Sequence, residues 1–117
     1  MNKNFKSYFK KKKILITGGT GLIGRPLTSY LKYLGAKVTV VSLDKIKPMP
    51  GIKFIYGNLN DYNFCKKITK KKDFVFHLAG IKGSALVTRT KPSSFYVPLL
   101  MMNTNIIEAC RLNKVKK

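Results

Sequence analysis

A glycine-rich segment at residues 17–24, TGGTGLIG, constrains the fold of this chain more than any other feature. Its glycines at 18, 21 and 24 form a variant of the G-x-G-x-x-G pattern, which by itself is weak evidence for a phosphate-binding loop. The context strengthens it. Residues 13–17 form an apolar run typical of a strand buried in a parallel sheet. Apolar residues then recur at helical spacing over residues 22–34, and Gly35 follows as a stop.

The rest of the sequence alternates between predicted strands and predicted helices. Strands are expected at residues 37–43, 52–56 and 73–78, which are rich in β-branched and aromatic residues. Helices are expected from the N-cap Asp61 to about residue 69, and over residues 99–112. Residues 45–51 and 81–98, which contain prolines, are predicted to be loops. This alternation predicts an α/β fold, a Rossmann-type doubly wound parallel sheet, incomplete at about four strands with flanking helices.

The glycines have distinct expected roles in binding a dinucleotide. Gly18 permits a tight turn, Gly21 lets the backbone approach a pyrophosphate, and Gly24 allows the helix to pack closely on the sheet. The backbone N–H groups at the start of the helix then face the phosphates, where the helix dipole helps. A glycine-rich turn without a ligand is the alternative.

Asp44 determines which dinucleotide is expected. It follows the second predicted strand, about 20 residues beyond the last glycine, where a carboxylate accepts hydrogen bonds from both hydroxyls of the adenosine ribose. The same carboxylate repels a 2′-phosphate, although Lys45 beside it softens that repulsion. NAD is therefore the predicted cofactor and NADP is less favoured. A plain turn residue is the alternative interpretation of Asp44.

The chain is strongly basic, with 24 Lys and Arg against 4 Asp and Glu, a formal net charge of +20. Such a charge attracts nucleic acid, anionic membranes and nucleotides alike. The cations, however, lie in short lysine runs at residues 10–13, 70–72 and 114–117, between apolar segments, and few of them are Arg. Nucleic acid is therefore a disfavoured partner. Residues 1–12 are predicted to be a basic, flexible or loosely packed arm before a domain at residues 13–117.

The remaining reactive residues form no catalytic or metal-binding pattern. Cys65 and Cys110 fall in predicted helices without C-x-x-C spacing or a nearby His, so neither a zinc site nor a disulfide is expected. His77, in an apolar strand, is expected to be packed or hydrogen-bonded. The apolar run at residues 14–16 is too short for a signal peptide or a membrane span, so a cytoplasmic location is expected.

Four stretches of this chain, at residues 17–24, 57–61, 75–80 and 103–109, resemble the extended short-chain dehydrogenase/reductases. Within them, the chain is most similar to the NAD-dependent nucleotide-sugar epimerase/dehydratase family. The resemblance implies that Asn58 and Leu59 flank the adenine, and that Leu78, Ala79 and Gly80 line the cofactor. It also implies that residues 81–84 approach the nicotinamide or the sugar. This chain departs from the family pattern at Asn58, where Asp is usual, and near Leu99, where many relatives have Asn.

The loop pattern, the acidic residue and the resemblance together give the candidate cofactor-binding residues. They are Gly18, Thr20, Gly21, Leu22, Ile23, Gly24, Asp44, Asn58, Leu59, Leu78, Ala79 and Gly80. The function implied is hydride transfer between a sugar carbon and NAD, with a nucleotide sugar as the substrate. The full-length form is compatible with a homodimer. A non-catalytic NAD-sensing or NAD-binding module is the alternative, and a basic nucleic-acid binder is less favoured.

No catalytic residue is expected within this chain. The family uses a Ser or Thr and a Tyr-x-x-x-Lys pair, in which the ammonium lowers the pKa of the phenol. The spacing occurs at Tyr8–Lys12, Tyr33–Lys37 and Tyr62–Lys66, but none of these pairs is expected at the carboxyl ends of the strands, where ligands bind. We therefore expect the N-terminal part of an NAD-binding domain, truncated where a fifth strand starts at residues 114–117 and inactive alone.

Overall fold

The structure, a computed structural model, describes residues 3–45, 49–81 and 85–117. Within these residues, an all-parallel four-stranded sheet has the strand order β3-β2-β1-β4. The strands are β1 (Lys13–Thr17), β2 (Lys37–Ser42), β3 (Lys53–Tyr56) and β4 (Phe74–His77). In register, Ile14 of β1 pairs with Val38 on one side and Phe74 on the other. The predicted parallel α/β fold is confirmed.

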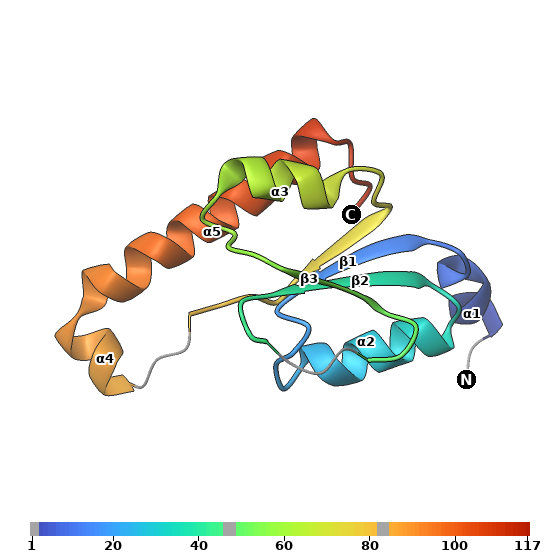
Figure 1. Cartoon of the computed structure of the whole chain (residues 1–117), viewed down its shortest axis with the longest axis horizontal. Helices are drawn as coiled ribbons and strands as arrows, with labels where there is room; N and C mark the ends of the chain where they lie inside the picture. The colour runs from blue at the N-terminus through green and yellow to red at the C-terminus, as the bar shows by residue number, and fades with distance from the viewer. Residues whose placement is uncertain (1–2, 46–48, 82–84) are drawn as a thin grey trace.

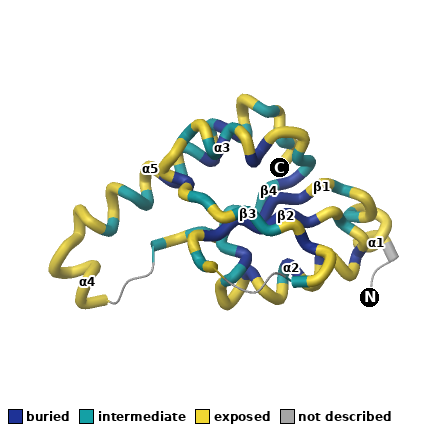
Figure 2. The backbone as a smooth tube through the Cα atoms, in the orientation of Figure 1, coloured by how far each residue is buried: buried dark blue, intermediate teal, exposed yellow. Residues whose placement is uncertain are grey.

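Helices cover both faces of this sheet, as Figure 1 shows. On one face lie α1 (Lys3–Phe9) and α2 (Gly24–Tyr33), and on the other lie α3 (Tyr62–Thr69) and α5 (Pro92–Leu112). Because alternate residues of a strand face opposite sides, Ile14 and Ile16 belong to the core under α2, whereas Leu15 belongs to the core under α3 and α5. Figure 2 shows the buried residues concentrated where these layers meet.

The structure describes residues 3–12 of the predicted basic arm, and residues 3–9 form the helix α1. The ring of Tyr8, at the end of α1, stacks on Phe74 of β4 with the ring centroids 5.6 Å apart. Phe9 meets the same ring edge-on at 5.9 Å. After the helix, the backbone N–H of Lys11 donates to the carbonyl of Gly35 at 2.8 Å. Aromatic contacts therefore connect this basic segment to the sheet, although Tyr8 stays 54% exposed.

The long loop predicted at residues 81–98 is wrong for most of its length. Residues 85–90 form α4 (Ala85–Thr90), and α5 begins at Pro92 rather than near residue 99. Pro92 occupies the first turn of α5, where its missing N–H leaves no hydrogen bond unmade. Pro98 lies inside the same helix, a position that sequence reasoning treats as a helix breaker. Residues 82–84, and residues 46–48 of the other predicted loop, lie outside the described residues.

The predicted N-cap of α3 is confirmed, because Asp61 Oδ1 accepts from the backbone N–H of Phe64 at 3.2 Å. The segment after α5 runs beside β4, where a further strand was expected. There the N–H of Lys116 donates to the carbonyl of Asp73 at 3.1 Å, and the N–H of Val75 donates to the carbonyl of Lys117 at 3.0 Å. No helix in the described part of the chain has the length and apolarity needed to cross a membrane.

Candidate functional site

A cavity of about 510 Å³ opens at the carboxyl ends of the four strands. Parallel strands bring the loops that follow them to one edge of the sheet, and this edge is where open α/β sheets bind ligands. The loops after β1, β2, β3 and β4 all contribute to the walls, and α5 adds Met102. The lining residues are Gly18, Thr20, Gly21, Val41, Ser42, Leu43, Asp44, Gly57, Asn58, Leu59, Asn60, Leu78, Ala79, Gly80, Ile81 and Met102.

Most of the predicted cofactor-binding residues come together in this cavity. Those that line it are Gly18, Thr20, Gly21, Asp44, Asn58, Leu59, Leu78, Ala79 and Gly80. Leu22, Ile23 and Gly24 are not in the lining. Because α2 begins at Gly24 rather than at residue 22, Leu22 and Ile23 belong to the loop, and their side chains are 94% and 68% exposed. A role for these residues through their backbone N–H groups stays a prediction.

Sequence reasoning missed several lining residues. Val41, Ser42, Leu43, Gly57 and Asn60 are sequence neighbours of predicted residues, and the rule that ligands bind at strand ends points to them. Met102 carries no such signal, because a methionine at helical spacing is typical of a core position. It reaches the cavity because α5 runs beside α3 over one face of the sheet and extends past the carboxyl ends of the strands.

The glycine loop has a backbone that only glycine fits at its key positions. Gly18 has a φ of 69°, and a Cβ atom there would lie 2.7 Å from the backbone nitrogen of Ala79. A Cβ atom on Gly24 would lie 2.3 Å from the carbonyl oxygen of Gly18. These contacts agree with the tight turn expected at Gly18 and the close packing expected at Gly24. At Gly21 the nearest atom is 3.4 Å away, so its cavity side stays open.

Hydrogen bonds from the glycine loop hold Asp44 at the cavity wall. The Thr20 hydroxyl donates to Asp44 Oδ2 at 3.2 Å, and it lies 3.0 Å from the hydroxyl oxygen of Ser42. Since Thr20 has a single proton to give, Ser42 donates to Thr20. The Ser42 oxygen in turn accepts from the backbone N–H of Asp44 at 3.0 Å. Thr20 therefore joins the glycine loop to the carboxylate, a role that the sequence did not indicate.

Asn58, where the family usually has Asp, uses its side chain partly within the loop. Its Oδ1 accepts from the backbone N–H of Asn60 at 2.9 Å. An amide oxygen has two lone pairs, so one remains for a donor in the cavity. The loop that carries Asn58 is fastened to α5, because the side-chain amide of Asn105 donates to the carbonyls of Leu59 and Asn60.

His77 is hydrogen-bonded on both ring nitrogens, as expected, and links β1, β4 and α5. Its Nδ1 lies 2.7 Å from Thr17 Oγ1, and its Nε2 lies 2.8 Å from Asn103 Oδ1. Because an amide oxygen can only accept, the proton of the neutral ring is on Nε2, and Thr17 donates to Nδ1. The backbone N–H of Ala79 then donates to Thr17 Oγ1 at 3.3 Å. This chain of hydrogen bonds positions the cavity wall at Ala79.

We expect Asn103→Ala to lower the free energy of unfolding by about 1–2 kcal/mol, because it leaves Nε2–H of half-buried His77 without its acceptor. Urea unfolding monitored by circular dichroism measures the change. Thr104→Ala, at the exposed next position of the same helix, is the control and should stay within about 0.5 kcal/mol of the wild type. Equal effects of the two substitutions would contradict the proposed link.

The two cysteines are free thiols, and burial raises the pKa of both. The pKa of Cys65 rises to about 11, because of burial first and then the negative charge of Asp61, so this thiol is protonated at neutral pH. In the described residues, no group of three or more His, Cys, Asp or Glu is placed to hold a metal ion.

The Tyr-x-x-x-Lys pairs are not in the lining of the cavity. Tyr8 packs on the sheet from α1, and Tyr33 lies at the end of α2 beneath Lys6. On α3, Lys66 Nζ lies 5.0 Å from the centre of the Tyr62 ring. The described residues therefore place none of these pairs where a ligand of the cavity would meet it.

Known proteins resemble this chain over most of its length. A family model described as NAD dependent epimerase/dehydratase matches residues 14–117. A UDP-N-acetylglucosamine 4,6-dehydratase (inverting) of Campylobacter jejuni is 33% identical over 125 residues, covering 93% of this chain and 35% of that protein. The chain thus spans about a third of the length of this curated relative.

Solved structures share the fold. Epimerase Mth375 of Methanothermobacter thermautotrophicus superposes with a TM-score of 0.84 at 25% identity, covering 96% of this chain and 35% of that one. MoeE5, solved in complex with UDP-glucuronic acid and NAD, superposes with a TM-score of 0.77 at 27% identity, covering 88% of this chain and 34% of that one. Together with a family match over residues 14–117, the strand order and the glycine loop show that this chain belongs to the NAD-dependent epimerase/dehydratase family.

Proposed function

We propose that this chain is the NAD-binding part of an enzyme that transfers hydride between a carbon of a nucleotide sugar and NAD. The observation that carries the proposal is the cavity in which the glycine loop and Asp44 meet, joined by Thr20. The Cβ positions of Gly18 and Gly24 are filled by backbone atoms, which fits the tight turn and the close packing of α2, and Gly21 lies in the cavity lining, where its backbone could approach a pyrophosphate. When bound, NAD supplies the hydride acceptor.

The proposed assignment takes the loops after β1, β2, β3 and β4 in turn. The backbone N–H groups of residues 22–24, at the start of α2, face the pyrophosphate, and the Asp44 carboxylate accepts from the hydroxyls of the adenosine ribose. Asn58 and Leu59 flank the adenine, and residues 78–80 line the path toward the nicotinamide. Residue 81 also lines the cavity, which supports the expectation that this loop approaches nicotinamide or sugar, although residues 82–84 lie outside the described residues.

The choice of NAD over NADP is supported by the carboxylate at the cavity wall. Calorimetric titration of the purified chain with each dinucleotide tests this cofactor preference. We expect NAD to bind at least about tenfold more tightly than NADP, because Asp44 repels the 2′-phosphate. Binding of neither dinucleotide would contradict the proposal, and tighter binding of NADP would contradict its cofactor assignment.

The nucleotide-sugar substrate is supported by the names of the relatives, which include a UDP-sugar dehydratase and a protein solved with UDP-glucuronic acid. We further propose that the 117 residues alone bind NAD without turning over a sugar nucleotide, because the described cavity walls hold no Tyr-x-x-x-Lys pair. In that case the chain acts alone as a non-catalytic NAD-binding module. Turnover of UDP-glucose by the purified chain would contradict this part of the proposal.

A cytoplasmic location and a homodimer of the full-length enzyme complete the proposal. The location is supported by the free thiols of Cys65 and Cys110, since reduced cysteines are typical of the cytosol. The homodimer is supported by large apolar side chains exposed on α5, including Tyr96 at 61%, Leu100 at 50% and Ile107 at 67%.

A further inference from the structure

A groove lined by lysines lies at the amino ends of the strands, at the edge of the sheet opposite the candidate cofactor cavity. Lys13, Lys37 and Lys53 are the first residues of β1, β2 and β3; the parallel register pairs Lys13 with Lys37, and Lys53 with Thr39, two residues further along β2. The loop between α3 and β4 adds a run of lysines. We call this the lysine groove; its volume is about 360 Å³, and its lining residues are Lys13, Lys37, Val38, Thr39, Lys53, Lys70, Lys71 and Lys72.

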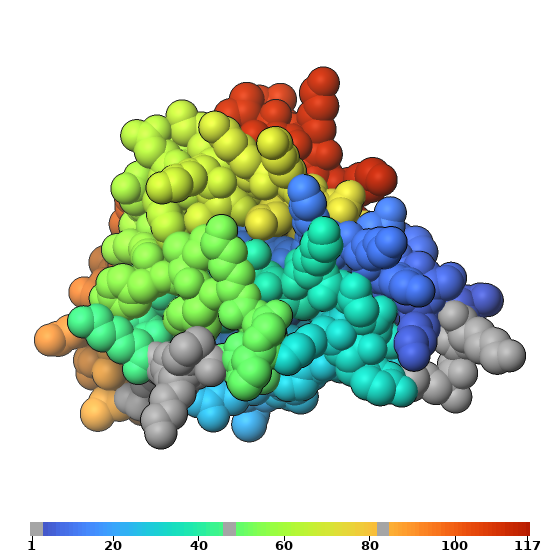
Figure 3. All heavy atoms as spheres, turned by 45° about the vertical axis from the view of Figure 1, so that its right-hand side comes forward, coloured from blue at the N-terminus to red at the C-terminus, as the bar shows by residue number. Residues whose placement is uncertain are grey.

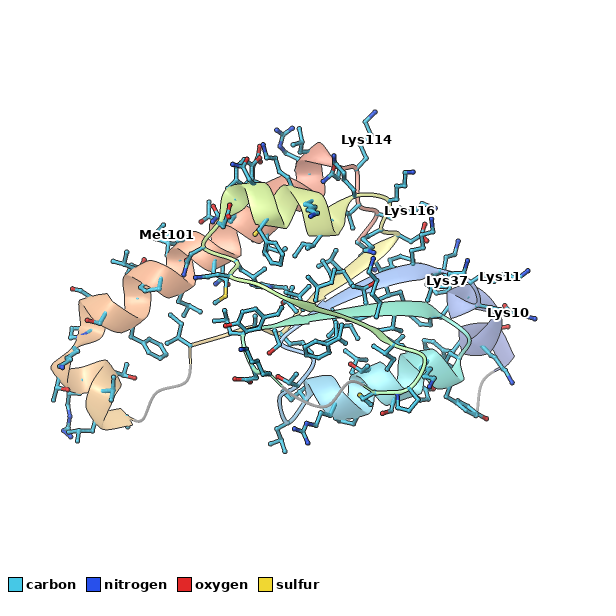
Figure 4. The ribbon with its side chains drawn as sticks, in the orientation of Figure 1. Lys10, Lys11, Lys37, Met101, Lys114 and Lys116 are labelled. Atoms are coloured by element: carbon cyan, nitrogen blue, oxygen red, sulfur yellow. The ribbon has the colours of Figure 1, made fainter. Side chains whose placement is uncertain are left out.

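Further lysines surround the groove because the loops that lead into the strands are themselves basic. Figure 4 labels Lys10, Lys11, Lys37, Lys114 and Lys116, which gather at one end of the molecule, whereas Met101 on α5 lies away from them. In the space-filling view of Figure 3, segments from the beginning, middle and end of the chain meet on this side. The fold therefore concentrates lysine runs that are far apart in the sequence.

Acidic residues do little to balance this charge. The chain has 4 Asp and Glu, and Asp73 is the acidic residue next to the groove. Its Oδ2 accepts from the backbone N–H of Lys13 at 2.8 Å. Asp44 lies at the opposite edge of the sheet, Asp61 caps α3, and Glu108 pairs with Arg111 at 2.7 Å on α5. The groove is left with a large excess of positive charge.

Lys72 lies among these positive charges, and its pKa is lowered. Its ammonium donates to Thr39 Oγ1 at 3.3 Å inside the groove. Burial, followed by the positive charges of Lys53 and Lys13, lowers the pKa of Lys72 below its usual value. An anion in the groove would offset the repulsion among these ammonium groups, because it interacts favourably with each of them.

Lysine occupies three backbone positions that favour glycine, and one of them, Lys71, lines the groove. Among the described residues, the non-glycine residues with positive φ are Lys11 (64°), Lys71 (56°) and Lys114 (54°). Each lies two residues beyond the end of a helix, where glycine adopts the left-handed conformation without steric cost. Lysine at all three sites adds charge at a cost in backbone strain, which supports a role for the charge.

The lining indicates the chemistry of the ligand. It contains ammonium groups, a hydroxyl and an aliphatic side chain, without an aromatic ring on which a base could stack. Lysine ammoniums act as point charges toward phosphate and carry no planar readout of a base. We propose that the lysine groove binds the linked phosphoryl groups of inorganic polyphosphate. This site is separate from the NAD site and does not depend on the proposed function.

Calorimetric titration of the chain with tripolyphosphate tests the proposal. Lys70→Gln/Lys71→Gln removes two exposed charges from the groove, and Arg89→Gln/Lys91→Gln removes two exposed charges at α4 as a matched control. We expect the groove variant to bind roughly tenfold more weakly and the control within about twofold of the wild type. Affinity should also fall steeply with added salt, and saturating NAD should leave it unchanged.

A second variant separates charge from folding. Lys71→Gly should weaken tripolyphosphate binding while keeping or raising the Tm, because glycine relieves the left-handed backbone. Equal losses in the groove and control variants would overturn the proposal, and so would displacement of tripolyphosphate by NAD. Tighter binding of a single-stranded oligonucleotide, or of anionic phosphatidylserine vesicles, at equal phosphate concentration would overturn it in favour of that polyanion.

Discussion

Replacing Gly18 by alanine is expected to lower the free energy of unfolding by about 2–5 kcal/mol and to abolish NAD binding. Two effects add. The backbone of Gly18 is left-handed, with a φ of 69°, which L-residues adopt only at a cost. In addition, the new Cβ would lie 2.7 Å from the nitrogen of Ala79, a backbone atom that cannot swing aside as a flexible side chain can. Relief of this contact requires the glycine loop and the loop after β4 to separate.

Urea unfolding and NAD calorimetry measure the two effects of Gly18→Ala separately. Gly80→Ala is the matched control for stability, because a Cβ atom there meets nothing within 4 Å. We expect this control to unfold within about 1 kcal/mol of the wild type. A Gly18→Ala protein with wild-type stability would show that the loop relaxes at no cost, contrary to the tight contact with Ala79.

Asp44→Asn is expected to weaken NAD binding by about 10–100-fold and to narrow or reverse the preference for NAD over NADP. The amide keeps the size of the side chain but loses the charge that attracts the ribose hydroxyls and repels a 2′-phosphate. Because asparagine keeps a side-chain oxygen that can accept from Thr20, stability should change little. The measurement is a pair of titrations, with NAD and with NADP, on each protein.

Asp61→Asn supplies the charge-matched control for Asp44→Asn. It also removes one carboxylate from a chain with few acidic residues, but asparagine caps a helix about as well as aspartate, so α3 should be unaffected. Its NAD affinity should stay within about twofold of the wild type. If both variants lose the same affinity, net charge rather than ribose binding explains the effect of Asp44.

The central part of the fold could be predicted from the sequence because local patterns and tertiary structure agree there. Buried strands in a parallel sheet are rich in apolar and β-branched residues, and the strands at residues 13–17 and 37–42 have that composition and are buried after their first residue. The glycine loop and Asp44 line one cavity because strand ends in a parallel sheet share one edge.

The parts that sequence reasoning missed depend on tertiary contacts. Residues 3–9 have the composition of a solvated basic segment. In the structure, however, Tyr8 and Phe9 contact the ring of Phe74, which is far away in the sequence. Residues 92–98 look like a loop because of their prolines, yet α5 accommodates one at its first turn and one in its interior. Likewise, the partners of His77 come from β1 and α5, and no local pattern pairs them.

The hydrogen bonds through His77 also provide an observable for solution studies. Its ring is held in one tautomer by Thr17 and Asn103, so the two ring nitrogens should give distinct NMR chemical shifts that persist while β1, β4 and α5 stay together. The backbone N–H of Ala79 donates to Thr17 in the same chain of hydrogen bonds, and Ala79 lies at the rim of the cavity. Its hydrogen-exchange rate would therefore report how often that rim opens, and a bound dinucleotide should slow it.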